Sequence, residues 1–558
     1  MEENQKIEDS LSLALTLSEE ERKEAMALNA GFLQGEKRWE LIVKSSKDIQ
    51  GLQTDRITIE PLDYNYYIVT LPAELIEDFA DREEIEYIEM PKRLMPQLRT
   101  ALEKSCFGLN PGVDELSGEG VFIGIIDSGI DLKNPIFLDE NRKTKVRYLY
   151  DQDESREYSA EEINDALLAN TELPFDRSGH GSRVAAIASK VAPKSELLIV
   201  KLNIENQDSF PHTTNLMRAI KWLKDKALKF HRPLAVNISY GNTYGSHDGD
   251  SLLERYIDAT AQDIIGNICI GSGNEASREG HFEGHIWQTG DVQMAELAVG
   301  AYERSLSVQL WSYAMDSFEI TILTPGQKRY TQSFDAKTVR MNQVNLGRNI
   351  LFIYSGTAKP YTTKAEFFIE FLPLDSYLES GIWEFQIKGT EVKNGTFHMY
   401  LPSYGFRMQT TRFLNPGPLR TVTIPATAKR AICVGAYDST DSSYADFSGR
   451  GSLGGDSIWQ LDKPDLAAPG VDLLLPPEFG YQRVSGTSYA TPMVTGATAL
   501  LLEWGPVKGN DPYLYGEKLK AALLKGARKL PFQTRLPDSL SGWGALCLRN
   551  ALRNGNAY

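Results

Sequence analysis

Residues 121–131 have the sequence Val-Phe-Ile-Gly-Ile-Ile-Asp-Ser-Gly-Ile-Asp. The positions before the first Asp form an unbroken run of apolar or small residues, which is typical of a strand that helices cover on both faces. Similar runs lie at Leu197–Val200, Leu234–Ile238 and Asn267–Ile270, and stretches with helical spacing lie at Thr214–Lys229 and Ser251–Ile264. The sequence therefore predicts an α/β fold, a parallel sheet with helices on both faces.

Between about residues 291 and 420 the helical spacing disappears. Short segments there largely alternate apolar and polar residues between Pro, Gly and Asn turns: Phe318–Leu323, Asn349–Tyr354, Ala365–Phe371, Gly381–Lys388 and Thr396–Leu401. Short strands at this spacing are typical of an all-β sandwich. The α/β pattern resumes at Thr421–Pro425, so we predict that the β-rich segment is inserted within one α/β domain.

The amino-terminal part has the pattern of a small α+β unit. Ser10–Leu28 has helical spacing, Leu75–Phe79 begins an acidic helix, and short strands are expected at Trp39–Val43, Tyr66–Leu71 and Ile85–Ile88. A charged stretch with two prolines follows and resembles a linker. The predicted division is 1–97, a separate domain; 98–290, the first part of the α/β domain; 291–420, the inserted β domain; and 421–558, the second α/β part.

The composition is that of a globular protein. The chain has 558 residues, of which 42% are hydrophobic, and its formal net charge is −16. An acidic surface opposes binding to phosphate backbones and to anionic lipid, so we expect neither nucleic acid nor a membrane as a partner. The longest apolar runs, such as Ala497–Leu502, are far shorter than the ~20 residues that cross a bilayer.

The cysteines and the amino terminus indicate the compartment. The four cysteines are scattered and form no Cys-x-x-Cys pair, which favours reduced thiols over disulfides or a zinc site. Residues 1–5, Met-Glu-Glu-Asn-Gln, lack a basic region followed by an apolar one. We therefore expect no secretory signal and a location in the cytoplasm or in a spore.

Two segments place reactive side chains at the ends of elements. Asp127 follows an apolar strand, and ligands of open parallel sheets bind at the carboxyl ends of strands. Taken alone, Asp127 is more readily a turn former or a helix cap. His180 stands between Gly179 and Gly181 at the start of an apolar helix. The other six histidines lie in polar or turn-rich stretches and are predicted at the surface: His212, His231, His247, His281, His285 and His398.

A third segment, Ser485–Gly496, leads into an apolar helix. Ser488 is expected in the first turn of that helix, where free N–H groups and the helix dipole favour developing negative charge. An isolated Gly-Thr-Ser is more often an ordinary helix cap. The segment therefore indicates a catalytic serine only in combination with the other two segments.

Together the three segments resemble the subtilisin-like serine proteases, or subtilases. The matching motifs are Asp127-Ser128-Gly129, Gly179-His180-Gly181-Ser182 and Gly486-Thr487-Ser488-Tyr489-Ala490-Thr491-Pro492, in the family's chain order. The resemblance spans about residues 98–290 and 421–558. It implies that Ser488 attacks a peptide carbonyl, that His180 transfers the proton, and that Asp127 orients the imidazole, with no cofactor.

The resemblance also implies substrate-binding residues. Gly271-Ser272-Gly273 leads into Asn274, which matches the family's oxyanion-hole Asn, although a Gly-Asn turn alone is a common feature. Ser239-Tyr240-Gly241 matches the edge segment that pairs with extended peptide. Tyr240 is alternatively a packed aromatic residue. Asp208-Ser209-Phe210 is expected at the opposite wall of the cleft.

Residues 1–97 resemble a subtilase prodomain, which acts as a folding template and then as an inhibitor. The family's spacing from Tyr87-Ile88-Glu89 puts the self-cleaved bond at Gln97–Leu98. The alternative is an ordinary interdomain linker. Residues 188–193, Ala-Ser-Lys-Val-Ala-Pro, run on without the loop that wraps calcium in familiar subtilisins, so we predict no metal there.

The insertion, the missing export signal and the complete triad together resemble the clostridial Csp spore-germination proteases. Those enzymes carry a jelly-roll insertion, retain their prodomain and cut the pro-form of a cortex-degrading hydrolase. The resemblance implies peptide or protein substrates, the chain's own cleaved prodomain as a partner, and a monomer. A regulatory or sensor scaffold, held inactive by a retained prodomain, is the alternative.

Overall fold

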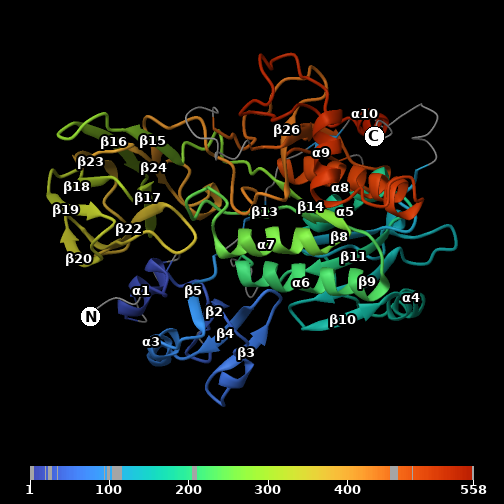
Figure 1. Cartoon of the computed structure of the whole chain (residues 1–558), viewed down its shortest axis with the longest axis horizontal. Helices are drawn as coiled ribbons and strands as arrows, with labels where there is room; N and C mark the ends of the chain where they lie inside the picture. Colours follow the sequence, from blue (N-terminus) through green and yellow to red (C-terminus); the bar gives the residue numbers. More distant parts are fainter. Residues whose placement is uncertain are drawn as a thin grey trace.

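The computed structural model describes residues 5–555 except 19–20, 23–24, 26–27, 34, 93–94, 97–100, 103–115, 204–209, 453–462 and 481. Its centre is an eight-stranded sheet (Figure 1). In spatial order the strands are β10 (Arg156–Ser159), β9 (Val146–Asp151), β11 (Glu196–Lys201), β8 (Phe122–Asp127), β12 (Leu234–Ile238), β14 (Gly266–Gly271), β26 (Ile432–Tyr437) and β27 (Leu466–Pro469). All neighbours pair in parallel except β10 and β9.

Helices cover both faces of this sheet, as the apolar strand predicts. Ile123 and Ile125 of β8 belong to one core, and Phe122 and Ile126 to the other, because successive side chains of a strand point to opposite faces. The first core contains α5 (His180–Val191), α8 (Thr487–Leu502) and α9 (Gly516–Gly526), and the second contains α6 (Thr213–Phe230) and α7 (Leu252–Asp263). Two further helices are α4 (Ala160–Ala169) and α10 (Leu548–Gly555). The predicted α/β fold is confirmed.

The amino-terminal unit is a five-stranded sheet with short helices. Its elements are α1 (Asp9–Thr16), β1 (Phe32–Leu33), β2 (Arg38–Ser45), β3 (Thr58–Pro61), β4 (Tyr66–Leu71), α3 (Ile76–Ala80) and β5 (Ile85–Glu89). The single helix expected over Ser10–Leu28 is wrong, because α1 ends at Thr16. Ser18 and Glu21 then bond to each other through backbone and side chain, in the arrangement that starts a new helix.

The β-rich segment forms two antiparallel sheets around one core. One sheet contains, in order, β15 (His281–His285), β24 (Thr396–Tyr400), β17 (Leu306–Tyr313), β22 (Lys364–Pro373), β21 (Asn349–Ser355) and β20 (Arg340–Leu346). The other contains β19 (Arg329–Asp335), β18 (Ser317–Leu323), β23 (Gly381–Glu391), β16 (Val292–Val299) and β25 (Arg412–Phe413). The first strand, β15, lies before residue 291, the predicted start of the insertion. The domain boundaries and the jelly-roll connectivity stay predictions.

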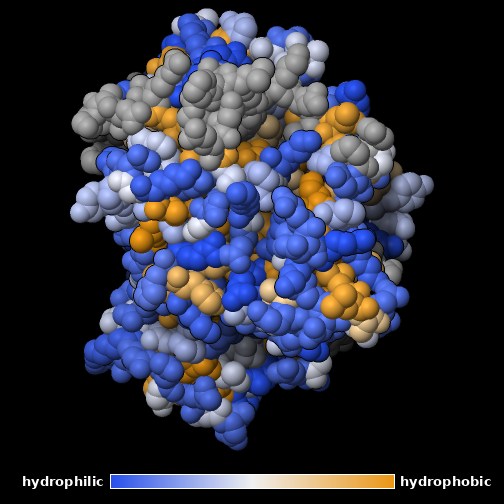
Figure 2. All heavy atoms as spheres, turned by 90° about the vertical axis from the view of Figure 1, so that its right-hand side faces the viewer, coloured by the Kyte–Doolittle hydropathy of each residue, from blue (hydrophilic) through white to orange (hydrophobic). Residues whose placement is uncertain are grey.

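The amino-terminal unit packs against both of the other parts. Phe352, Tyr354, Phe368 and Leu372 of the β sandwich lie in the same hydrophobic core as α1 and β2. Figure 1 shows the amino-terminal sheet below the sandwich and beside α6. In Figure 2 the visible face is largely hydrophilic, with apolar residues in separate patches. Among the described residues, no helix combines the length and apolar character that crossing a membrane requires.

Candidate active site

Asp127 and His180 meet at the carboxyl edge of the central sheet. Asp127 ends β8, and His180 is the first residue of α5. His180 Nδ1 lies 2.6 Å from Asp127 Oδ1, and both residues are buried. The carboxylate fixes one ring nitrogen as the donor and leaves the other as the acceptor. That second nitrogen, Nε2, is buried and has no hydrogen-bond partner within the described part of the chain.

Gly181 lets the helix approach the strand this closely. A Cβ at position 181 would lie 2.3 Å from the carbonyl oxygen of Gly129 and 3.0 Å from Asp127 Cβ. Any side chain at this position would push α5 away from β8 and lengthen the contact between Asp127 and His180. The glycine after the His is therefore a requirement of the site's geometry.

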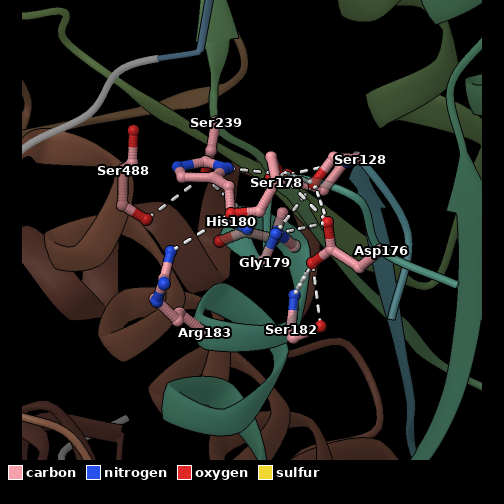
Figure 3. Close-up of polar contacts among 12 residues, drawn as sticks. Ser128, Asp176, Ser178, Gly179, His180, Ser182, Arg183, Ser239 and Ser488 are labelled. Carbon is pink, nitrogen blue, oxygen red and sulfur yellow. Dashed lines mark hydrogen bonds and ion pairs between the residues drawn. The ribbon is translucent and has the colours of Figure 1, made fainter. Parts of the chain in front are cut away.

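Asp176 organises the turn before His180 (Figure 3). One carboxylate oxygen accepts hydrogen bonds from the Ser128 hydroxyl and the Gly179 N–H, each at 2.8 Å. The other accepts both the N–H and the hydroxyl of Ser182 at 2.8 Å. The network thus joins the residue after Asp127 to the first turn of α5. Neither Asp176 nor this role of Ser128 and Ser182 was predicted from the sequence. The available signal was a carboxylate four residues before His180.

Ser488 enters the same cluster from α8, of which it is the second residue. Its carbonyl oxygen accepts a hydrogen bond from the Ser239 hydroxyl at 3.2 Å, and Ser239 accepts one from Asn237 Nδ2 at 2.9 Å. Thr495, two turns along α8, donates to Asn237 Oδ1. These contacts fasten the start of α8 to the end of β12. The next residue, Tyr489, places its ring centroid 5.5 Å from that of His180.

Asn274 lies beside the start of α8. Its Oδ1 accepts a hydrogen bond from the Thr487 N–H at 3.1 Å, which fixes the orientation of the amide. Its Nδ2 is buried and has no partner among the residues described. Gly273 has a φ of +96°, and a Cβ there would lie 2.5 Å from Thr423 Cγ2. The tight turn before Asn274 therefore requires glycine, and it leaves one amide donor available.

The chain between the amino-terminal unit and the central domain reaches this site from two sides. The short strand β6 (Met95–Pro96) pairs antiparallel with β13 (Tyr240–Gly241), with Pro96 opposite Tyr240. Further along, β7 (Ala101–Leu102) pairs in parallel with β28 (Asp472–Leu474), which also pairs with β29 (Arg483–Val484). Gln97 and Leu98 lie outside the described residues, as do Asp208 and Ser209. Tyr240 is itself buried, so its side chain packs inside while its backbone pairs with β6.

The candidate site is closed in this form of the chain. Asp127 and Ser488 are fully buried, and His180 is 1% exposed. Gly271 ends β14, and the next residue, Ser272, is buried. Its N–H donates a hydrogen bond to the carbonyl of Val434, and its carbonyl accepts one from the N–H of Thr423. A substrate from solution would therefore have to displace what covers these side chains.

Three histidines predicted at the surface are buried, so that prediction is wrong for them. His247, His281 and His398 are each at most 7% exposed. The His247 and His281 rings stack on Tyr400, with centroids 4.0 and 4.7 Å away, and His398 stacks on His281. Burial lowers the pKa of His281 to about 3. Their polar, turn-rich surroundings in the sequence gave no sign of this burial, because each ring packs on residues that lie far away in the sequence.

The described residues contain neither a readily ionised thiol nor a cluster of metal ligands. Burial raises the pKa of Cys269 to about 11 and that of Cys433 to about 12, so both thiols stay protonated at neutral pH. Cys547 is also buried, and Cys106 lies outside the described residues. No group of three or more His, Cys, Asp or Glu suited to a metal occurs in the part of the chain that the structure describes.

Comparison with known proteins identifies the family. The model of the subtilase family matches residues 118–359 and 411–544. The chain belongs to the subtilase family. A second model, the Csp protease B prodomain, matches residues 5–92 of this subtilase. The predicted family and its prodomain are thereby confirmed.

Solved and curated relatives agree with this assignment. The structure of the Clostridium perfringens CspB protease is 33% identical, covers 81% of this subtilase and 96% of that chain, and has a TM-score of 0.74. The serine protease AprX of Bacillus subtilis is 31% identical over 137 residues, 21% of this chain and 29% of its own. Subtilisin-like protease SBT6.1 of Arabidopsis thaliana is 37% identical over 124 residues, 21% of this chain and 12% of its own. The subtilase thus spans less than a third of either curated relative.

Proposed function

We propose that this subtilase is a serine endopeptidase that first cuts its own chain after the prodomain and then cuts peptide substrates. The pairing of β6 with β13 carries the proposal, because an extended substrate adds to an exposed strand edge in the same way. The chain returns at β7 on β28. In the sequence, the proposed bond between residues 97 and 98 lies between these two strands.

The register of β6 supports cleavage between Gln97 and Leu98. Pro96, the residue before Gln97, stands opposite Tyr240, the residue after Ser239. The Ser239 hydroxyl donates a hydrogen bond to the carbonyl oxygen of Ser488. The strand that precedes the proposed bond thus pairs next to a segment that contacts Ser488.

The chemistry follows from the Asp127–His180 contact. Ser488 Oγ attacks the scissile carbonyl while His180 Nε2 takes its proton, and His180 then returns the proton to the leaving amine. Asp127 contacts His180 Nδ1 and thereby keeps the tautomer in which Nε2 is the base. It also stabilises the imidazolium that forms when Nε2 takes the proton. The lack of a partner on Nε2 among the described residues supports this role.

Asn274 is proposed as the oxyanion donor. Its Nδ2, together with the backbone N–H of Ser488 in the first turn of α8, would bind the negative oxygen of the tetrahedral intermediate. The contact from Thr487 to Oδ1 orients the amide in advance, so no reorganisation accompanies the reaction. Gly271-Ser272-Gly273 and Ser239-Tyr240-Gly241 are the proposed walls of the substrate cleft.

The prodomain is proposed to stay bound as an inhibitor after cleavage. Arg218 of α6 contacts two prodomain carboxylates, Glu40 at 2.6 Å and Glu60 at 2.8 Å. Asp9 of α1 forms an ion pair with Lys359 of the sandwich. Following the likeness to CspB, we propose limited proteolysis of a pro-enzyme, as in spore germination, as the biological activity.

The closed site also favours a second candidate, a regulatory scaffold that the prodomain keeps inactive. Fluorophosphonate labelling of the purified chain, before and after limited proteolysis of the prodomain, separates the two. The endopeptidase predicts labelling after proteolysis that Ser488→Ala abolishes. Absence of label in both samples would support the scaffold and contradict the enzyme.

A further inference from the structure

A polar cleft of about 350 Å³ lies where the β sandwich meets the central domain, apart from the candidate active site. Its walls come from five separate segments: the loop after β13, the end of β17, the start of β22, the connection that leaves the sandwich, and the loop after β26. The cleft has the size of a small-molecule site, which usually occupies about 300–1,000 Å³.

The cleft concentrates positive charge in an acidic protein. Its lining contains five cationic side chains and two carboxylates: Lys364, Arg420, Lys429, Arg450 and Lys463 against Asp248 and Asp250. The whole chain carries a formal charge of −16. Two of the cations are neutralised locally, Lys429 by Asp250 at 3.2 Å and Lys463 by Asp465 at 2.7 Å. Three remain to be explained.

Lys364 and Arg420 are held in the cleft without a close carboxylate, although Lys364 Nζ also lies 3.5 Å from the centroid of the Tyr313 ring. Asp248 is 3.8 Å from Lys364 Nζ and 3.6 Å from Arg420 Nη1, whereas charge-assisted hydrogen bonds measure about 2.7–2.9 Å. Neither side chain donates a hydrogen bond to any other described residue. Their side chains are only 6% and 15% exposed, so water compensates them poorly.

Arg450 is a third cation of the cleft, and it has no carboxylate partner among the described residues. Its Nε is buried and has no hydrogen-bond partner there. One terminal nitrogen contacts the carbonyl of Asp446 at 3.4 Å, and the guanidinium lies 5.2 Å from the centroid of the Tyr444 ring. Burial also lowers the pKa of Lys364, with Asp248 opposing the shift, as expected for an ammonium that lacks its counter-charge. Ion pairs with a purely structural role would bring a carboxylate within hydrogen-bond distance of these cations. The observed pairs of Lys364 and Arg420 with Asp248 are longer than that.

We propose that this cleft binds a small multivalent oxyanion, a polycarboxylate or a phosphate-bearing metabolite, through Lys364, Arg420 and Arg450. Guanidinium forks and an ammonium present convergent donors that suit carboxylate and phosphate oxygens. Lys364 belongs to the sandwich and Arg450 to the central domain, so the bound anion bridges the two. Binding therefore stabilises the junction by mass action.

Isothermal titration calorimetry of the full-length Ser488→Ala chain tests the proposal, with citrate and inorganic phosphate as probes at constant ionic strength. We expect saturable binding of at least one probe at one site, and a ligand-dependent rise in melting temperature. Binding of citrate alone identifies a polycarboxylate site, and binding of phosphate alone a phosphate site. Lys364→Gln and Arg420→Gln should each raise the dissociation constant about tenfold or more.

Lys388→Gln is the matched control, because Lys388 is an exposed lysine of the same sandwich, 4.0 Å from its nearest carboxylate. It should leave the affinity unchanged. If Arg420→Gln fails to fold, as judged by its melting curve without ligand, Lys364→Gln still provides the comparison. The proposal is overturned by an absence of saturable binding for both probes, or by wild-type affinity in the folded cleft variants.

Discussion

Asp176 determines how firmly His180 is held. Both its carboxylate oxygens accept hydrogen bonds that join Ser128 to the first turn of α5. An amide at this position would turn one acceptor into a donor that faces the N–H and hydroxyl of Ser182. The geometry of the candidate triad thus depends on a residue outside it.

We therefore expect Asp176→Asn to lower the free energy of unfolding by about 1–3 kcal/mol, the cost of a buried donor without an acceptor. Urea denaturation in the Ser488→Ala background measures this loss without interference from proteolysis. Asp165→Asn, at an exposed position on α4, is the control. Equal stability of the two variants would show that the network does not hold the turn.

Asn274 gives the second prediction at this scale. Removing one oxyanion donor typically lowers kcat by about 10²–10³, because the donor acts on charge that develops only in the transition state. Asn274→Ala should show this loss with little change in KM, measured on a peptide substrate after removal of the prodomain. Asn415→Ala, at an exposed site on the sandwich, should keep wild-type kinetics. A rise in KM with unchanged kcat would instead assign Asn274 to ground-state binding.

Single residues also mark the limit of prediction from sequence. Asp127, His180 and Ser488 could be proposed because each lies in a motif that matches the subtilase family, in the family's chain order. The burial of His247 and His398 was not, because their partners Tyr400 and His281 lie far away in sequence. Local polarity is a poor guide where a turn is covered by another part of the chain.

At the scale of elements, α6 carries the contact that anchors the prodomain. Arg218 is 20% exposed and bonds Glu40 and Glu60. Although burial opposes it, Arg218 keeps the pKa of Glu40 below its usual value, so the carboxylate is charged at neutral pH. This pair is more buried than the surface ion pairs that contribute little.

Arg218→Ala should therefore weaken retention of the cleaved prodomain about tenfold or more, since hydrogen bonds to charged groups contribute about 1.5–3 kcal/mol. Co-elution of the two fragments in size-exclusion chromatography, at a series of dilutions, measures the effect. Lys221→Ala is the control, because among the described residues this lysine of the same helix pairs with Asp225 of α6 and with no prodomain carboxylate. Equal retention in the two variants would contradict the anchoring role.

The end of β5 makes prodomain docking depend on pH. Burial, with the nearby Glu8 carboxylate, raises the pKa of Glu89 to about 8, although Lys92 opposes the shift. Because this value exceeds that of the unfolded chain, the stabilising contribution is complete below about pH 4.5 and is lost as the pH rises through about 8. Retention of the prodomain should fall between about pH 4.5 and about pH 8. Glu89→Gln should flatten this profile, and an unchanged slope in that variant would assign the pH dependence elsewhere.

One predicted element is interrupted in the structure, and one correctly predicted strand is shared between two cores. The helix expected from Ser10 stops at Thr16 because Ser18 caps a new turn, which helical spacing alone does not detect. In β22, Phe367 and Ile369 face the sandwich core, while Phe368 and Leu372 face the prodomain. Its nearly continuous apolar run carried that signal, but the covering partner is distant in sequence.

In the whole molecule, three packed parts converge on one closed site. The apolar runs predicted the central sheet, and the resemblance to subtilases predicted a prodomain before it. The packing of prodomain on sandwich, through Tyr354 and Phe368 among others, was not predictable, because it joins segments about 300 residues apart. Ser488 is buried in this form of the chain.

Intact mass and amino-terminal analysis of the recombinant wild-type chain, with Ser488→Ala alongside, tests self-processing most directly. We predict two wild-type fragments, residues 1–97 and 98–558 with Leu98 as the new amino terminus, and an uncut Ser488→Ala chain. A wild-type chain that stays whole, or a variant that is cut at the same bond, would contradict the account.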